Sequence, residues 1–167
     1  MADCPCGSLK DYRQCCGLYI DQSQRPPTPE ALMRSRYTAY TQANMTYIKN
    51  TMKGEPLLGF HEQEVSQWAA KVDWLSLQVV NCKLDADNPD RGYVEFLASL
   101  RDGGKLQAIH ERSEFVRVDG QWFYTAAHKP LYAKPQHKRA ISRNAPCPCG
   151  SQKKYKNCHA LSERQGH

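Results

Sequence analysis

The chain carries nearly the same thirteen-residue motif at both of its ends. Residues 4–16 read CPCGSLKDYRQCC, and residues 147–159 read CPCGSQKKYKNCH. In each copy a Cys-x-Cys pair is followed by eight residues and then by two adjacent metal-ligand side chains. Each copy therefore offers four sulfur or imidazole donors, which is the number that a tetrahedral zinc ion needs.

The spacing predicts two separate metal sites, one at each end. We expect the first ion to be held by Cys4, Cys6, Cys15 and Cys16, and the second by Cys147, Cys149, Cys158 and His159. A unit this short cannot bury a core, so metal binding must supply most of its folding free energy, on the order of 10 kcal/mol. Zinc suits such donors best, although iron also occupies sulfur-based sites.

Two other interpretations of the cysteines are weaker. Seven of the eight lie in the two motifs, and only Cys82 lies elsewhere. Disulfides would require a strained bond between Cys15 and Cys16, and the C-terminal copy has an odd number of cysteines. A redox dithiol would be expected in a Cys-x-x-Cys pattern, which these motifs lack. Cys82 falls on a predicted strand, where we expect a small buried hydrophobe.

Length and termini limit the location of the protein. The 167 residues suit one ordinary domain with small attachments. No apolar run approaches the roughly 18 residues that cross a bilayer. The N-terminus, MADCPCGS, lacks the basic and apolar regions of a signal peptide. We therefore expect a cytosolic protein without membrane contact, where thiols stay reduced.

Polar, proline-containing segments divide the chain. We expect a metal module over 1–20, a linker over 21–28, a central domain over 29–132, a basic linker over 133–143 and a second module over 144–163. The net charge of +6 is concentrated in residues 134–167, where eight lysines and arginines face one glutamate. A basic tail of this kind is evidence about partners and none about fold.

The hydrophobic pattern of the central domain changes from helical to extended. Helical periodicity runs through 28–42, 44–52 and 61–72, with Thr28 as a predicted N-cap and Pro29 at the first helical position. Alternation then predicts strands over 74–84, 91–100, 105–118 and 122–128, joined in two places by tight turns containing glycine. In the first strand we expect Leu75, Leu77 and Val79 to share one face. The three tryptophans, Trp68, Trp74 and Trp122, are predicted core residues. The order of elements predicts an α+β domain whose helices cover one face of an antiparallel sheet.

Both terminal motifs resemble the SEC-C motif, the zinc-binding module known from the C-terminal tail of the preprotein translocase ATPase SecA. The resemblance implies the metal-ligand role of the eight residues named above. It also implies a protein- or ribosome-binding role, because in SecA the module contacts the export chaperone SecB and the ribosome. Lys153, Lys154 and Lys156 make the C-terminal copy the more basic, so we expect it to be the better contact for an acidic protein or for ribosomal RNA. Tyr155 is the only aromatic residue of the tail, so we expect no sequence-specific DNA reading.

The helices followed by a sheet, with LMRSRYTAYTQANMTYI and HERSEFVRVDGQWFY, resemble the YchJ family. That resemblance implies a cone-like domain similar to nuclear transport factor two (NTF2). About three helices would pack on a curved sheet of about four strands, between two SEC-C modules. Domains of this shape often enclose a pocket and can form homodimers.

Two functions follow from these features. The leading hypothesis is a non-enzymatic zinc-binding adaptor that contacts a protein partner or the ribosome through its SEC-C modules. The alternative is an enzyme or small-ligand-binding protein that acts from a pocket in the central cone, and a pocket lined by an acid or histidine would favour it. The candidate residues for such chemistry are Tyr37, Tyr40, His110, Glu111, Arg112 and Glu114. On a strand, Glu111 and Ser113 would share the apolar face, while His110, Arg112 and Glu114 would share the opposite face.

Overall fold

A computed structural model of the chain describes residues 2–132 and Lys154. The chain divides into one unit of residues 1–132 and a second of residues 133–167. The predicted basic linker and C-terminal module, with Cys147, Cys149, Cys158 and His159, thus lie outside the described residues apart from Lys154.

Helices form where the sequence offers capping residues and apolar periodicity. Helix α2 spans Pro29–Thr41, and its N-cap Thr28 accepts a hydrogen bond from the backbone N–H of Ala31 at 3.1 Å, as predicted. Helices α3 (Met45–Asn50) and α5 (Glu62–Lys71) also lie in the predicted segments, whereas the short α4 (Glu55–Leu58) was not predicted. No helix within residues 2–132 is long and apolar enough to cross a membrane.

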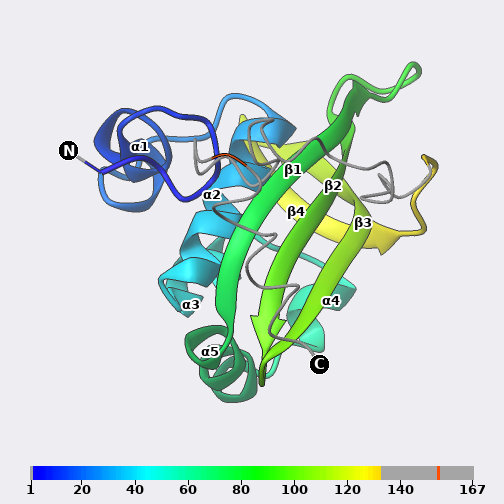
Figure 1. Ribbon diagram of the computed structural model, residues 1–167. Coiled ribbons are helices and arrows are strands. Elements are labelled where there is room, and N and C mark those ends of the chain that lie inside the picture. The colour runs from blue at the N-terminus through cyan, green and yellow to red at the C-terminus, as the bar shows by residue number, and fades with distance from the viewer. Residues whose placement is uncertain (1, 133–153, 155–167) are drawn as a thin grey trace. The chain divides into compact units, whose positions relative to one another are not determined.

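Four strands form one antiparallel sheet in the order β1-β2-β3-β4 (Figure 1). They are β1 (Asp73–Leu84), β2 (Arg91–Asp102), β3 (Lys105–Val118) and β4 (Gln121–His128). Gly103, Gly104 and Gly120 adopt positive φ in the two tight turns, a conformation that glycine adopts without steric cost. The predicted α+β fold is confirmed.

The predicted inner face of β1 is confirmed for Leu77 and Val79 and wrong for Leu75, because β1 is irregular there. Trp74 pairs with Leu100 and Leu77 pairs with Ala98, so both point to the face that carries the buried residues of β2. A register shift between Trp74 and Ser76 leaves Leu75 as an extra residue. Such a bulge places two residues opposite one and reverses the alternation. Trp74, rather than Leu75, therefore faces inward.

The inner face of the sheet is covered by α2, which contacts β1, β2 and β4. Leu32 and Tyr37 of α2 pack in one core cluster with Val94, Phe96 and Phe115 of the sheet. Burying each large apolar side chain contributes about 1.5–3 kcal/mol. The three-dimensional position of α2 is therefore set by this shared core.

Other predicted core positions are only partly correct. Trp122 is buried at 3% exposure, as predicted, but Trp68 and Trp74 are only half-buried. Cys82, which we expected to be buried, is exposed. It lies on the edge strand β1, two residues before the end of the strand at Leu84. Strand periodicity alone does not reveal whether a helix covers a given position.

The outer face of the sheet holds a buried carboxylate that the sequence analysis missed. Glu95 on β2 is 2% exposed and accepts hydrogen bonds from the backbone N–H groups of Leu131 at 2.7 Å and Tyr132 at 3.2 Å. Nε2 of His110 lies 3.1 Å from the second carboxylate oxygen. Burial alone would raise the pKa of Glu95, but the Leu131 N–H, His110 and the Tyr132 N–H together lower it. Glu95 thus ties the segment after β4 to the sheet.

The lowered pKa of Glu95 predicts a pH-dependent contribution to stability. The contribution is present above the ordinary glutamate pKa of about 4.3 and is lost as the pH falls through the lower pKa of the folded state. At pH 7 we expect Glu95→Gln to reduce the free energy of unfolding by about 1–3 kcal/mol. Urea unfolding followed by tryptophan fluorescence would measure this difference. It should shrink as the pH falls below about 4.3 and through the lowered pKa of the folded state, because wild-type Glu95 is then also protonated.

Exposed Glu64, in the first turn of α5, offers the comparison, since Glu64→Gln should change the free energy of unfolding at pH 7 by less than about 1 kcal/mol. A Glu95→Gln effect of the same size at acid and neutral pH would contradict the proposed role of the carboxylate.

Candidate metal centre

The first cysteine pair lies in a tight loop at the N-terminus. The backbone N–H of Cys4 donates to the Lys10 carbonyl at 2.8 Å, and that of Gly7 donates to the Cys4 carbonyl at 3.2 Å. Gly7 has φ +80°, as expected for a residue that turns the chain back. The loop therefore points Cys4 and Cys6 in one direction.

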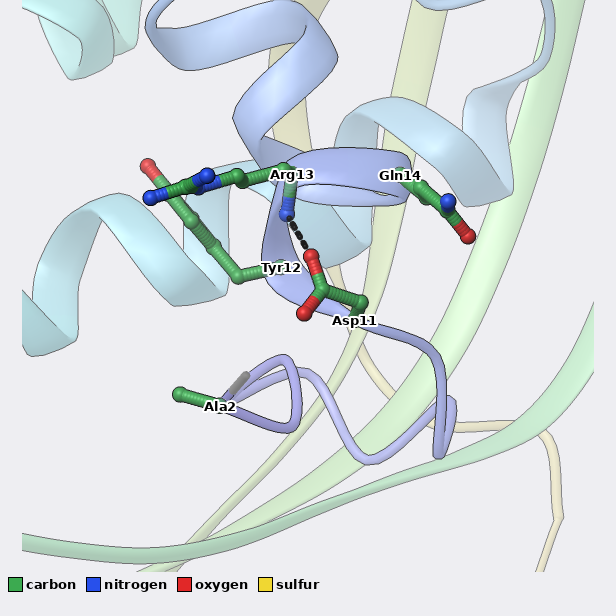
Figure 2. Close-up of a pocket in the computed structure, with 5 residues that line it drawn as sticks. All are labelled: Ala2, Asp11, Tyr12, Arg13 and Gln14. Carbon is green, nitrogen blue, oxygen red and sulfur yellow. Dashed lines mark hydrogen bonds between the residues drawn. The ribbon is translucent and has the colours of Figure 1, made fainter.

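Two short helices supply the second pair. Asp11 caps η1 (Tyr12–Gln14), because its carboxylate accepts a hydrogen bond from the Arg13 backbone N–H at 2.9 Å (Figure 2). Helix α1 (Cys16–Ile20) follows directly. A Cβ at Gly17 would lie 2.7 Å from the Tyr12 carbonyl oxygen, so only glycine fits this close approach. The packing of η1 against α1 brings Cys15 and Cys16 back toward the loop.

The four N-terminal sulfurs meet in one cluster. All four Sγ atoms lie within 4.8 Å of one another, with Cys6–Cys15 at 3.6 Å and Cys15–Cys16 at 4.0 Å. Zinc–sulfur bonds of about 2.3 Å in a tetrahedron would separate the sulfurs by about 3.8 Å. The two distances lie on either side of that value. The cluster can therefore hold a metal ion, and its donor set fits zinc.

The cysteine cluster is part of the hydrophobic core of the protein. Cys4, Cys6 and Cys16 are at most 3% exposed and belong to the same core cluster as Leu32 and Tyr37 of α2. The predicted linker 21–28 contains no helix or strand. It is hydrogen-bonded to the sheet, because Arg25 donates to the Asp119 carbonyl and the indole N–H of Trp122 donates to the Pro27 carbonyl. Residues 2–20 thus pack directly on the central domain.

Polar groups surround the sulfurs. Thr38 Oγ1 lies 3.8 Å from Cys4 Sγ, and Ser8 Oγ lies 3.2 Å from Cys15 Sγ. Arg34 donates from Nη1 to the Cys6 carbonyl at 2.8 Å. Burial works to lower the pKa of Arg34, but Glu30 and Cys6 more than offset it, and the net shift is upward. A permanent positive charge therefore stands beside a site that would carry a charge of −2 with zinc and four thiolates.

The thiols cannot ionise independently at these distances. Contacts from the Cys16 and Cys4 thiols lower the pKa of Cys6, and contacts with Cys4 and Cys6 raise the pKa of Cys16. The second thiolate is disfavoured because the first is already charged. A divalent cation would replace the protons and remove this repulsion.

Two hollows adjoin the module. One, of about 620 Å³, is lined by Ala2 and residues 11–14 and holds no cysteine (Figure 2). The other, of about 370 Å³, reaches Cys15, which is half-exposed, and is lined by Lys10, Tyr19, Glu30 and Arg34 among others. Cys16 also lines this hollow, and Cys15 is the most exposed of the four N-terminal cysteines.

The candidate residues of the central domain separate as the alternation predicted. Tyr37, Tyr40 and Glu111 line a partly open cavity of about 300 Å³ together with Ser113. His110, Arg112 and Glu114 occupy the opposite face of β3, where the register pairs Arg112 with the outward-facing Glu95. Of the six candidate residues, the structure therefore brings together Tyr37, Tyr40 and Glu111. Glu111 is the acid that the ligand-binding alternative requires.

Sequence analysis missed two residues of this cavity. Arg36 lines it from α2 at 5% exposure, and Tyr124 lines it from β4. Arg36 lies three residues after the buried Met33, so a charged residue on the apolar face of the helix was the available signal. Tyr124 carried no signal, because aromatic residues are ordinary in strands.

Family comparisons agree with the two kinds of module. Residues 28–127 match the model of the YchJ middle domain, described as NTF2-like, and residues 2–18 and 143–161 match the SEC-C motif. A UPF0225 protein of Geobacter sulfurreducens is 39% identical over 155 residues, covering 93% of this chain and 96% of that protein. A UPF0225 protein of Photorhabdus laumondii is 40% identical over 158 residues, with the same coverage.

Solved structures of similar proteins include two with SEC-C motifs. A solution structure from Rhodopseudomonas palustris is 37% identical, with a TM-score of 0.68, and the match covers 76% of this chain and 98% of that one. A crystal structure from Psychrobacter arcticus is 27% identical, with a TM-score of 0.65, and the match covers 96% and 97% of the two chains.

The metal centre predicts a defined stoichiometry. Elemental analysis of the purified, reduced chain should find about two zinc ions per chain, and about one in Cys6→Ser or Cys149→Ser. Cys82→Ser is the matched control, because exposed Cys82 lies outside the cluster, and it should retain both ions. Protein that contains no ion but keeps residues 2–20 ordered would contradict the assignment.

Proposed function

The chain belongs to the UPF0225 family of YchJ-like proteins with SEC-C motifs, and on that premise we propose that it is a cytosolic, zinc-stabilised adaptor. In this proposal each SEC-C module holds one zinc ion, and the modules contact a protein partner or the ribosome. The central domain packs against the N-terminal module and is followed in the sequence by the C-terminal one. The adaptor itself catalyses no reaction at its metal.

The observation that carries this proposal is the four-sulfur cluster. Four thiolates complete a tetrahedral shell and leave no open position for a substrate, as in structural zinc sites. Three of the four sulfurs are buried in the core, which favours a structural role over a reactive one. The ion would thus shape a surface rather than perform chemistry.

The surface of the N-terminal module supports a binding role. Leu9 is 60% exposed and has φ +63°, so the turn between the cysteine pairs presents an apolar side chain to solvent. Exposed Lys10 follows it. Water contact with a large apolar side chain is unfavourable, and a partner that covers Leu9 would remove it.

The C-terminal module is the stronger proposed contact, because of its charge. Residues 134–167 carry a net charge of +7, and Lys153, Lys154 and Lys156 flank the predicted ligands. A site with three thiolates and one histidine around zinc carries −1, which leaves the module positive overall. A positive module suits RNA phosphates or an acidic protein surface.

Partner capture from a cell lysate tests the adaptor. The tagged full chain should recover ribosomes or a defined protein, and recovery should fall at least about tenfold in Cys158→Ser, which removes one predicted zinc ligand. Cys82→Ser should recover the partner normally. Recovery should also decrease with added salt, because phosphate or carboxylate contacts are screened. Circular dichroism and tryptophan fluorescence would verify that the central domain of each variant is folded.

Unchanged recovery by Cys158→Ser would refute docking through the C-terminal module. Equal loss in Cys158→Ser and Cys82→Ser would show that the effect does not arise from the metal site.

A further inference from the structure

The cavity of the central domain has a lining suited to a flat molecule. It lies between α2, α5 and the inner face of the sheet, and its volume is about 300 Å³, at the lower end of ligand pockets. Half of the residues that line it are aromatic. The aromatic residues are Tyr37, Tyr40, Trp68, Trp74, Phe96, Phe115 and Tyr124.

Three of the aromatic rings that line the cavity, those of Tyr37, Trp68 and Trp74, pack edge-to-face on one another. Trp74 meets Tyr37 at 5.6 Å between ring centroids and Trp68 at 5.3 Å, both nearly perpendicular. The indole N–H of Trp74 donates to the Ala69 carbonyl at 3.0 Å, which fixes the ring. A wall held in this way needs little reordering when a ligand binds.

One polar group of the cavity is a buried guanidinium. Arg36 is 5% exposed, and its Nη1 donates to the Ile48 carbonyl at 2.8 Å and to Thr51 Oγ1 at 2.7 Å. Within residues 2–132 its Nε and Nη2 make no hydrogen bond. Burial lowers the pKa of Arg36, because the charged form loses hydration. Neither Nε nor Nη2 is a buried donor without a partner, so both face the open cavity, where a ligand could supply an acceptor.

The second charged group of the cavity is the carboxylate of Glu111, and one of its two oxygens already accepts hydrogen bonds. Oε1 of Glu111 accepts hydrogen bonds from Ser113 Oγ at 2.8 Å and from the Tyr124 hydroxyl at 3.1 Å. Within the same described residues Oε2 accepts none. The ring of Tyr124 also lies under the Arg36 guanidinium, 4.8 Å from centroid to carbon, so Tyr124 stands between the two charged groups.

The charges limit what can bind. Arg36 and Glu111 carry opposite charges that largely cancel, so a charged ligand would bring a desolvated charge without a net partner. A neutral molecule with a donor next to an acceptor would satisfy both groups. We propose that this cavity is a binding site for an uncharged, planar molecule of one or two rings that donates a hydrogen bond to Glu111 and accepts one from Arg36. Cyclic amides of heteroaromatic rings have this chemistry. The site is independent of the adaptor role.

Titration of the zinc-loaded, ¹⁵N-labelled full chain by NMR tests the site. The probe is 2-quinolone, a neutral two-ring cyclic amide, and the readouts are the indole N–H signals of Trp68 and Trp74. Trp122 serves as an internal control, because its indole N–H donates to the Pro27 carbonyl and it does not line the cavity. We expect 2-quinolone to shift the first two signals and leave the third in place.

Three further probes isolate the ligand class. Naphthalene has the same flat shape without polar groups, 2-naphthoate is anionic, and 2-naphthylmethylammonium is cationic. We expect each to bind at least about tenfold more weakly than 2-quinolone. Naphthalene makes no hydrogen bond to Arg36 or Glu111, and each ion brings a desolvated charge that the opposite charges of those two residues do not balance. Tighter binding of either ion, or equal binding of naphthalene, would overturn the proposed class. No shift of Trp68 and Trp74 with any probe would overturn the site.

Variants test the residue assignment. Glu111→Gln keeps the shape of the side chain but removes its charge, and we expect about tenfold weaker binding of 2-quinolone. Ala98→Leu, on the buried β2 wall, should fill the cavity and abolish binding. Glu64→Gln on exposed α5 should change nothing. Glu111→Gln retains the native side-chain volume, so it provides the test even where Ala98→Leu disrupts packing. Unchanged affinity in Glu111→Gln would refute the role of the carboxylate.

Discussion

The four cysteine sulfurs that meet beside α2 are the constraint on which the N-terminal half of the structure depends. Residues 2–20 contain only a tight loop and two helical segments of three and five residues, too little to bury a core of their own. Yet Cys4, Cys6 and Cys16 are among the most buried side chains of the described chain and share a core cluster with α2. Four thiols packed this closely repel one another when ionised, and a divalent ion bound between them would remove that repulsion and become the main source of order.

Helix α2 links this cluster to the rest of the protein. On one side Thr38 and Arg34 contact Cys4 and the Cys6 backbone, and on another Arg36, Tyr37 and Tyr40 line the central cavity. The N-terminal module thus packs against the central domain and shares its core, and is not a separate domain joined only by a linker. An adaptor with this construction would hold the surface of its N-terminal module in a fixed position relative to the cavity. Any ligand of the cavity would touch the same helix that the ion supports.

Strong local signals made much of this arrangement predictable. The repeated cysteine spacing identified the cluster residues, and the glycine turns located the hairpins of the sheet. The sequence could not reveal features that depend on tertiary contacts. The bulge at Leu75 reversed a strand face, Cys82 proved exposed on an edge strand, and Glu95 is buried only because the backbone of Leu131 and Tyr132 returns to the sheet. Helical periodicity placed Arg36 on the apolar face of α2, but it could not show that this face borders a cavity.

Zinc-edge X-ray absorption on the chain that carries both Cys149→Ser and Cys158→Ser would examine the N-terminal centre by itself. Our account requires a first shell made of sulfur alone, with four zinc–sulfur distances of about 2.3 Å. A nitrogen or oxygen donor in that shell would mean that one of the four cysteines is not a ligand and that the ion keeps a position open for chemistry.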